Sequence, residues 1–309
     1  MTRFHPRIYV HQPGFQSTVQ DLGRPGYGHL GISASGAADP LSLRIGNLLV
    51  GNPENAAAIE MTLTGGCFEF DAGTVVALAG SDFGVPRWES FEVKSGQTLA
   101  CGPTRSGARC YLCVRGGIDV APVLGSRSTQ VMTGLGGTAL RAGDVLPIGI
   151  AGPASPPPSF GPRLLHSTVP GRAIRVTAGP QSERFSSAFY QSAFLVSRHS
   201  NRMGLRLEGP CVEHRERGRL LTEGAALGAI QIPPDGQPII LFVEHQTTGG
   251  YPKIANVISA DLHLLGQLRP RDEVRFELVT MERARMLLRR QELYVRLSRN
   301  GTRKTDIPE

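Results

Sequence analysis

Short apolar runs separated by turn residues recur along most of the 309-residue chain. Glycine and proline are frequent, with 38 and 23 residues, as expected of a chain that turns often. The clearest strand-like runs are residues 8–12, 59–63, 67–70, 74–79, 110–114 and 174–178. We therefore predict a mainly β fold with a few short helices.

One helix is predicted early in the chain. Asp39 is placed as its N-cap and Pro40 as its first residue, and the apolar residues of 41–49 recur on one face before Gly51 ends it. We interpret Asp39 as a helix cap rather than as a catalytic acid.

The most informative stretch is 228–253, in which an apolar run, residues 239–243, leads into a polar and glycine-rich loop, residues 244–250. Strand ends that lead into polar loops often carry binding or catalytic residues. Pro252 and the apolar spacing after it predict a helix with Lys253 in its first turn. A positive charge there opposes the helix dipole, which favours a role toward a ligand. On the residues alone, a functional loop and an ordinary turn after a central strand have equal weight.

This loop offers hydrogen-bond donors that suit an anion or an amide carbonyl. The backbone N–H groups of Gly249 and Gly250 are unobstructed, and two neighbouring threonines carry hydroxyls. The candidate substrate-binding residues of the loop are Gln246, Thr247, Thr248, Gly249, Gly250 and Tyr251.

Two further polar loops lie in the first half of the chain. Residues 14–26 combine amides, an acid and a base with several glycines, and residues 124–129 place an arginine between two serines. A guanidinium in such a loop can hold a carboxylate or a phosphate, but both loops also fit ordinary turn chemistry. Their candidate substrate-binding residues are Gln20, Asp21, Arg24, Ser126, Arg127 and Ser128.

The chain is predicted to form two β lobes joined by a connector. Five prolines fall within residues 151–163 without periodicity, which is typical of a semi-rigid linker. We place the first lobe at residues 1–150 and the second at residues 164–280. Residues 140–146 and 268–274 resemble each other, which indicates two lobes of related plan.

The positive charge of the chain is concentrated at its end. Residues 281–309, predicted to form a basic C-terminal helix and tail, hold eight Arg/Lys against four acids and so supply +4 of the formal net charge of +7. The rest of the chain has no basic patch interleaved with aromatic residues, so no nucleic-acid partner is predicted.

The five cysteines predict neither a metal site nor a redox pair. Cys110 and Cys113 match C-x-x-C, but they lie in a strand-like run, where positions three apart point to opposite faces. We interpret them as small buried apolar residues and predict no metal.

No apolar run approaches the roughly 20 residues that a membrane helix needs, and the first residues lack the apolar core of a signal peptide. We therefore expect a cytoplasmic protein without a membrane partner.

Several catalytic motifs are missing. The chain has no G-x-x-x-x-G-K-[ST] loop for ATP, no Met-Lys-Met segment that carries biotin, and three lysines in total. Any energy-coupled chemistry is therefore expected to need another chain. Neither G-x-S-x-G nor H-E-x-x-H occurs, which argues against a serine hydrolase or a zinc protease.

Several motifs occur in a fixed order along the chain, at residues 14–24, 36–39, 46–52, 116–117, 125–129, 202–204 and 246–253. Taken together, they resemble the biotin-dependent carboxyltransferase family. That family includes allophanate hydrolase subunit 2, the carboxyltransferase half of urea amidolyase and the C subunit of bacterial 5-oxoprolinase. The likeness spans roughly residues 7–290.

The resemblance implies two cyclophilin-like β-barrel lobes and a partner protein. That partner is of the allophanate hydrolase subunit 1 type, like the B subunit of 5-oxoprolinase, and the A subunit is a further partner. The active site is expected in a cleft where the two proteins meet, with residues 239–243 and 246–253 as one wall and residues 20–24 and 126–128 as the other.

The resemblance leaves the reaction open between two members of the family. In one, a 5-oxoprolinase complex uses ATP to open 5-oxoproline to glutamate; in the other, carboxybiotin on a separate carrier donates a carboxyl group to urea or a similar amide. The 309-residue chain with no fused biotin carrier or amidase favours the first. A third alternative is not enzymatic: a regulatory antagonist of a histidine-kinase inhibitor.

Ring opening needs a stabilised oxyanion and a proton carrier. Lys253 is the candidate cation, and Glu244 or His245 is the candidate proton carrier. No cofactor is expected to be bound covalently. The chain departs from the family pattern twice: Glu244-His245 stands where Asp and a variable residue are more common, and Arg271 replaces Gly in a closing Pro-Gly-Asp turn.

Overall fold

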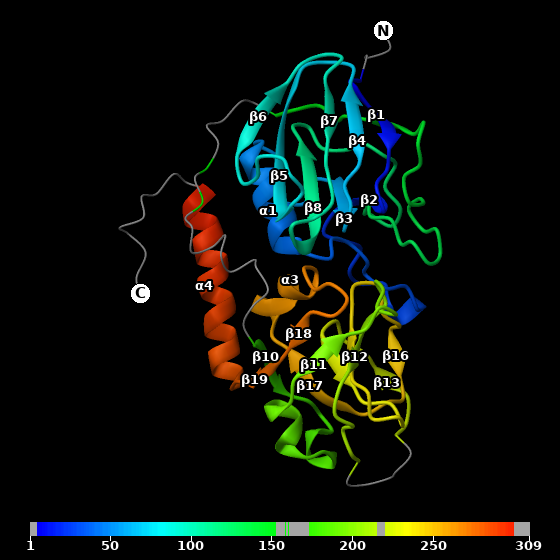
Figure 1. The fold of residues 1–309 in the computed structure, drawn as a ribbon, viewed down its shortest axis with the longest axis vertical. Helices are drawn as coiled ribbons and strands as arrows, with labels where there is room; N and C mark the ends of the chain where they lie inside the picture. The colour runs from blue at the N-terminus through cyan, green and yellow to red at the C-terminus, as the bar shows by residue number, and fades with distance from the viewer. Residues whose placement is uncertain (1–4, 153–157, 159, 161–172, 215–219, 300–309) are drawn as a thin grey trace. The chain divides into compact units, whose positions relative to one another are not determined.

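The computed structural model describes residues 5–152, 158, 160, 173–214 and 220–299 (Figure 1). Contacts divide the chain into two compact units. Among the described residues, unit 1 comprises 5–24, 35–152, 158, 160 and 293–299, and unit 2 comprises 25–34, 173–214 and 220–292. Residues 25–34 thus group with unit 2, although the sequence analysis placed them in the first lobe. Most of the predicted connector, and residues 300–309 of the tail, lie outside the described residues.

Unit 1 contains two antiparallel sheets. The first has the order β7-β4-β1-β9 and the second the order β2-β3-β8-β5-β6. Apolar residues from both sheets form one buried cluster, so the two sheets share a core. The strands are β1 (Arg7–Gln12), β2 (Gln16–Gln20), β3 (Ala58–Thr62), β4 (Cys67–Phe70), β5 (Thr74–Asp82), β6 (Ser90–Val93), β7 (Thr98–Ala100), β8 (Ser106–Val114) and β9 (Val145–Pro147).

Strand β8 is buried on both faces because a helix covers the second sheet. Its residues alternate between two apolar clusters: Cys110 lies in the core between the sheets, and Cys113 lies in the cluster formed with α1 (Pro40–Leu49). Burial raises the pKa of both thiols. The prediction that these cysteines face opposite ways is confirmed, and no group of metal-ligating side chains occurs in the described part of the chain.

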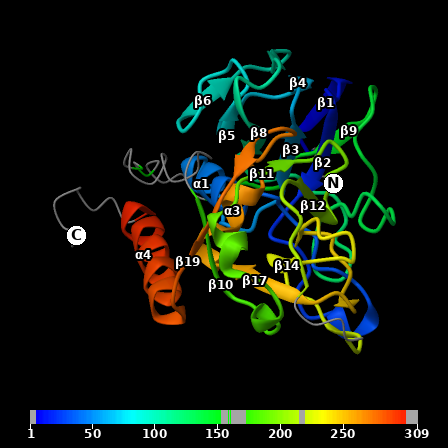
Figure 2. The ribbon, with the colours of Figure 1, turned by 60° about the horizontal axis from the view of Figure 1, so that its bottom comes forward.

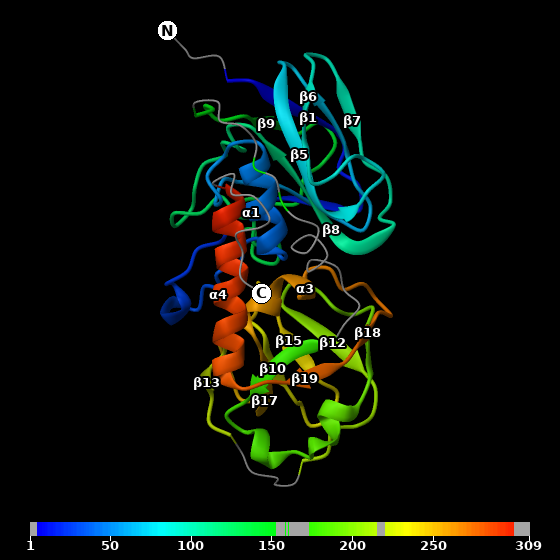
Figure 3. The ribbon, with the colours of Figure 1, turned by 90° about the vertical axis from the view of Figure 1, so that its left-hand side faces the viewer.

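Helix α1 starts as the sequence predicted. The carboxylate of Asp39 accepts hydrogen bonds from the N–H of Ser42 at 2.8 Å and from its hydroxyl at 2.6 Å, and Pro40 occupies the first turn. Gly46 lets the helix approach β8 closely, since an added Cβ would lie 2.7 Å from the sulfur of Cys113. Figure 3 shows α1 lying along β5 and β8.

Unit 2 is built on an eight-stranded sheet with the order β18-β11-β12-β15-β14-β17-β10-β19 (Figure 2). The two edge strands are separated by the single residue Arg275, so the sheet nearly closes into a barrel. Its strands are β10 (Ile174–Ala178), β11 (Phe194–Val196), β12 (Gly204–Glu208), β14 (Ala229–Gln231), β15 (Ile239–Leu241), β17 (Lys253–Val257), β18 (Glu273–Val274) and β19 (Phe276–Leu278). A two-stranded ribbon, β13 (Glu223–Gly224) with β16 (Thr248–Gly249), completes the β structure of the described residues.

The helix predicted after Pro252 was wrong, because Lys253 begins strand β17. This strand lies between β14 and β10 in the middle of the sheet and is buried along most of its length. A strand covered on both faces is apolar almost throughout, so its pattern does not distinguish it from a buried helix. Helical structure begins only at η4 (Ser259–Asp261) and α3 (Leu262–Leu265).

The remaining helices are short except for the last. They are η1 (Gly28–Leu30), η2 (Ser182–Arg184), η3 (Ser187–Gln191) and α4 (Met281–Arg299). The predicted C-terminal helix is therefore present, and Leu287 and Leu288 pack it onto an apolar patch of unit 2. Taken as a whole, the mainly β class with a few short helices is confirmed. Among the described helices none is both long and apolar enough for a transmembrane span.

The two units contain the same turn. In residues 141–144 and in residues 269–272, the N–H of the fourth residue donates to the carbonyl of the first at 3.1 Å. In each turn the third residue donates at 2.8 Å to a neighbouring strand, at Val10 in unit 1 and Val196 in unit 2. The likeness that we noted between these sequence segments therefore extends to their backbone hydrogen bonds.

Candidate functional site

Lys253 lies at the start of β17 with its ammonium group buried in unit 2. Its side chain is 4% exposed, and Nζ donates to Oε1 of Glu223 at 2.6 Å. The hydrogen bond from Lys253 lowers the pKa of the Glu223 carboxyl. Glu223 is 39% exposed, so the pair joins a buried cation to a carboxylate that water reaches.

Gln181 fixes this ion pair from both ends. Its side-chain oxygen accepts the backbone N–H of Lys253 at 2.9 Å, and its Nε2 donates to Glu223 at 3.0 Å. An added Cβ at Gly179 would lie 2.3 Å from the carbonyl oxygen of Lys253, so this position needs glycine. An ammonium can donate three hydrogen bonds, and within the described residues Glu223 is the one side-chain acceptor that it has.

Two glutamines and a glycine lie beside this pair. Gln231 is opposite Lys253 in the β14–β17 register, and Gly249 is opposite Glu223 in the β13–β16 ribbon. The side-chain amide of Gln246 donates to Oε1 of Gln231 at 3.4 Å. Nε2 of Gln231 lies 2.8 Å from where a Cβ on Gly249 would be, so a side chain at this position would displace the Gln231 amide. This buried Nε2 has no acceptor among the described residues.

One ring nitrogen of His245 has no hydrogen-bond partner among the described residues. Its Nδ1 lies 2.7 Å from the carbonyl oxygen of Gln246, which can only accept, so Nδ1 carries the proton. Burial lowers the pKa of His245, which favours the neutral ring. Nε2 is then a proton acceptor.

Glu244 has a different charged partner from Lys253. It is buried and forms an ion pair with Arg202, whose Nε lies 2.5 Å from Oε1. Its backbone N–H also donates to the carbonyl of Arg202 at 2.8 Å. Of the two candidate proton carriers, Glu244 is thus paired with an arginine, whereas His245 keeps one ring nitrogen without a partner among the described residues.

The other predicted residues of this loop contribute mainly through the backbone. The carbonyl of Thr247 accepts the N–H of Ala225 at 2.9 Å, and Thr248 lies in β16. Gly250 and Tyr251 follow β16 on the surface, with Tyr251 46% exposed. The strand is shorter than the apolar run before the loop, since β15 ends at Leu241, while Phe242 and Val243 are also buried.

The candidate residues in unit 1 come together around the carboxylate of Asp21. Its Oδ1 accepts from the hydroxyl of Ser126 at 2.6 Å and from the N–H of Gly23 at 2.8 Å. Its Oδ2 accepts the backbone N–H of Arg127 at 2.6 Å. The Ser126 hydroxyl also lies 2.9 Å from that of Ser128.

Arg24 and Gln20 are buried beside this network. Arg24 donates to the carbonyls of Ser128 and Val123, and Gln20 donates to Thr18 and to the carbonyl of Thr129. The side chain of Arg127 turns to Asp119, 2.7 Å away. The predicted polar loops of unit 1 are thus brought together, but protein groups occupy most of their donors.

We name the group formed by Lys253, Glu223, Gln181, Gln231, Gln246 and Gly249 the Lys253 cluster. Three of its residues, Glu223, Gln181 and Gln231, were missed by the sequence analysis. Gln231 did carry a signal, since it is a single amide within the apolar run 229–232. Glu223 and Gln181 carried none, because they reach Lys253 from 30 and 72 residues away.

The chain belongs to the family described as carboxyltransferase domain, subdomain A and B, whose model matches residues 30–278. The resemblance inferred from the motifs is confirmed. The chain is 39% identical over 301 residues to the 5-oxoprolinase C subunit of Escherichia coli (strain K12), covering 93% of this chain and 96% of that one.

Two fungal proteins are also similar. Urea amidolyase of Saccharomyces cerevisiae is 34% identical, and the match covers 96% of this chain but 18% of that protein. The crystal structure of Kluyveromyces lactis urea carboxylase matches with a TM-score of 0.88 at 31% identity, covering 99% of this chain and 30% of that one. The chain thus spans less than a third of either fungal protein.

Proposed function

We propose that this chain is a subunit of an ATP-dependent 5-oxoprolinase complex. Together with a partner like the B subunit of 5-oxoprolinase, and with an A subunit, it would bind 5-oxoproline and open it to glutamate. The observation that carries the proposal is the 39% identity to the 5-oxoprolinase C subunit over nearly the full length of that protein.

The Lys253 cluster supports this proposal chemically. 5-Oxoproline carries a carboxylate and a lactam carbonyl. The ammonium of Lys253 suits the carboxylate, and the Nε2 donor of Gln231 suits the carbonyl oxygen on which negative charge develops. Opening the ring adds water across the C–N bond, and the neutral imidazole of His245 can accept a proton from that water.

ATP is expected to act on another chain of the complex, since this one lacks the glycine-rich phosphate loop. ATP would supply the driving force and activation for ring opening. The residues of this chain would bind and orient the substrate and move a proton.

A second candidate function is carboxyl transfer to urea or a similar amide. The name of the matching family and the structural likeness to the fungal urea carboxylase favour it. In that case biotin would arrive on a separate carrier, and the same donors would orient the accepting amide.

One experiment distinguishes the two functions. The chain is purified alone and with its partner subunits, and ADP release is measured with 5-oxoproline and, separately, with urea and a biotinylated carrier protein. We expect no turnover by the chain alone and 5-oxoproline-dependent ADP release by the complex. Turnover that requires urea and biotin instead would reject the first proposal in favour of the second.

A further inference from the structure

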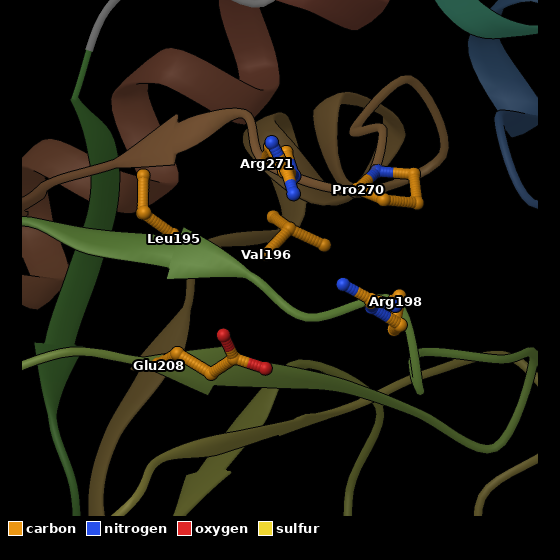
Figure 4. Close-up of a pocket in the computed structure, with 6 residues that line it drawn as sticks. All are labelled: Leu195, Val196, Arg198, Glu208, Pro270 and Arg271. Carbon is orange, nitrogen blue, oxygen red and sulfur yellow. The ribbon is translucent and has the colours of Figure 1, made fainter.

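A separate cavity of about 600 Å³ opens on unit 2, on the other side of β15 from the Lys253 cluster. Figure 4 shows Arg271 and Pro270 on one side of it, Glu208 on the other, Arg198 between them and Val196 at the centre. Its residues come from β11, β12 and the turn 269–272; they are Leu195, Val196, Arg198, Glu208, Pro270 and Arg271. None of them belongs to the proposed 5-oxoproline site.

The charged side chains of this cavity have no partner among the described residues. Arg198, Glu208 and Arg271 are exposed and form no side-chain hydrogen bond or ion pair with any of those residues. Arginines on nearby segments differ: Arg269 pairs with Asp272 at 3.5 Å, and Arg275 pairs with Glu273 at 2.7 Å. Two guanidinium groups are thus left for a ligand.

The backbone at Arg271 adds an independent observation. Its φ is +73°, in the left-handed region, where residues other than glycine are disfavoured. In the matching turn of unit 1, the same position is Gly143, with φ of +91°. The hydrogen bonds of the two turns are the same, so the turn itself does not require an arginine. A non-glycine residue kept in this conformation points to a role for its side chain.

The chemistry of the cavity defines its ligand. Arg198 and Arg271 can each bind a carboxylate, and Glu208 can accept from an ammonium group. Val196 and the half-exposed Leu195 provide an apolar wall beside them. An acidic α-amino acid has two carboxylates, one ammonium group and a short chain of methylenes, and so matches all three features.

We propose that this cavity, which we name the Arg198–Arg271 pocket, binds a free acidic amino acid of the glutamate type. The pocket is separate from the Lys253 cluster, so the proposal stands whether or not the chain acts on 5-oxoproline. If it does, the pocket would bind the product class of the complex and give it a site for feedback.

The test is calorimetric titration of the full chain, or of its complex, with L-glutamate, glutarate, 5-oxoproline and inorganic phosphate. We expect L-glutamate to bind, and Arg198→Ala and Arg271→Gly each to weaken its binding by at least about tenfold. Glu208→Gln should weaken binding of L-glutamate but not of glutarate, which has no ammonium group. Arg289→Ala, an exposed arginine on α4, is the matched control and should change nothing.

Arg271→Gly separates binding from folding. Glycine relieves the left-handed backbone, so this variant should melt at the same temperature as the unmodified chain or higher while it loses affinity. L-glutamate that does not bind at millimolar concentration, or that binds the Arg198→Ala and Arg271→Gly variants unchanged, would overturn the proposal. Phosphate binding in place of L-glutamate would also overturn it and would indicate a simple anion site.

Discussion

The cluster around Asp21 in unit 1 and the cluster around Lys253 in unit 2 are both buried, polar and built from loops next to strands. Asp21 accepts three hydrogen bonds from its own unit, so its carboxylate is used internally. Lys253 has one side-chain acceptor among the described residues, and the neighbouring Gln231 has a buried donor without an acceptor there. A polar loop can therefore stabilise a fold or bind a ligand. The donors that have no acceptor within the protein decide between these roles.

The largest effect is expected at Lys253. Lys253→Met keeps the apolar stem but removes the cation, and we expect the activity of the assembled complex to fall by about 100-fold or more. The free energy of unfolding should change little, because Glu223 can be hydrated once its partner is gone. Lys94→Met, at an exposed lysine, is the control. Full activity in Lys253→Met would show that the cluster is structural, like the one in unit 1.

Asp21→Ala should mainly lower stability, whereas Lys253→Met should mainly lower activity. It leaves three donors, on Gly23, Ser126 and Arg127, without their acceptor, and we expect the free energy of unfolding to fall by about 2–4 kcal/mol. Asp119→Ala removes an exposed partner of Arg127 and should cost less than about 1 kcal/mol. Chemical denaturation of both variants measures the difference. Unchanged stability in Asp21→Ala would contradict a structural role for the unit 1 cluster.

Gln231→Leu gives the sharpest distinction between binding and folding. Because Nε2 of Gln231 has no acceptor among the described residues, an apolar side chain of similar size should change the free energy of unfolding by less than about 1 kcal/mol. Affinity for 5-oxoproline should fall by about tenfold, since the proposed donor to its carbonyl is lost. Equal losses of stability and affinity would show that Gln231 acts only in packing.

The smallest effect is a pH dependence at His245. Burial lowers its pKa in the folded state, so below about pH 6.5 the unfolded chain takes up a proton that the folded chain does not. The contribution of His245 to stability therefore declines as pH falls through that range. His245→Gln should reduce the difference in melting temperature between pH 7 and pH 5. If the melting temperature of this variant depends on pH as that of the unmodified chain does, His245 does not contribute to the pH dependence of stability.

Much of the fold could be predicted because its signals are local. The cap at Asp39 and the opposite orientations of Cys110 and Cys113 follow from spacing alone, and both are confirmed. The helix expected after Pro252 was wrong, because this segment forms an inner strand of the sheet. Strand β17 lies between two others, and burial on both faces removed the alternation that identifies a strand.

The sequence by itself determined the mainly β class, the repeated turn and the segments in which polar chemistry is gathered. The tertiary structure decided which of those polar groups have partners. Lys253 meets Gln181 across 72 residues of chain, and Asp21 meets Ser126 across 105. A hydrogen bond forms only when donor and acceptor are positioned to within a few tenths of an ångström. Spacing along the chain reports only which face of a strand or helix a residue occupies. Whether a buried donor is left over for a ligand is therefore settled only when distant strands pair.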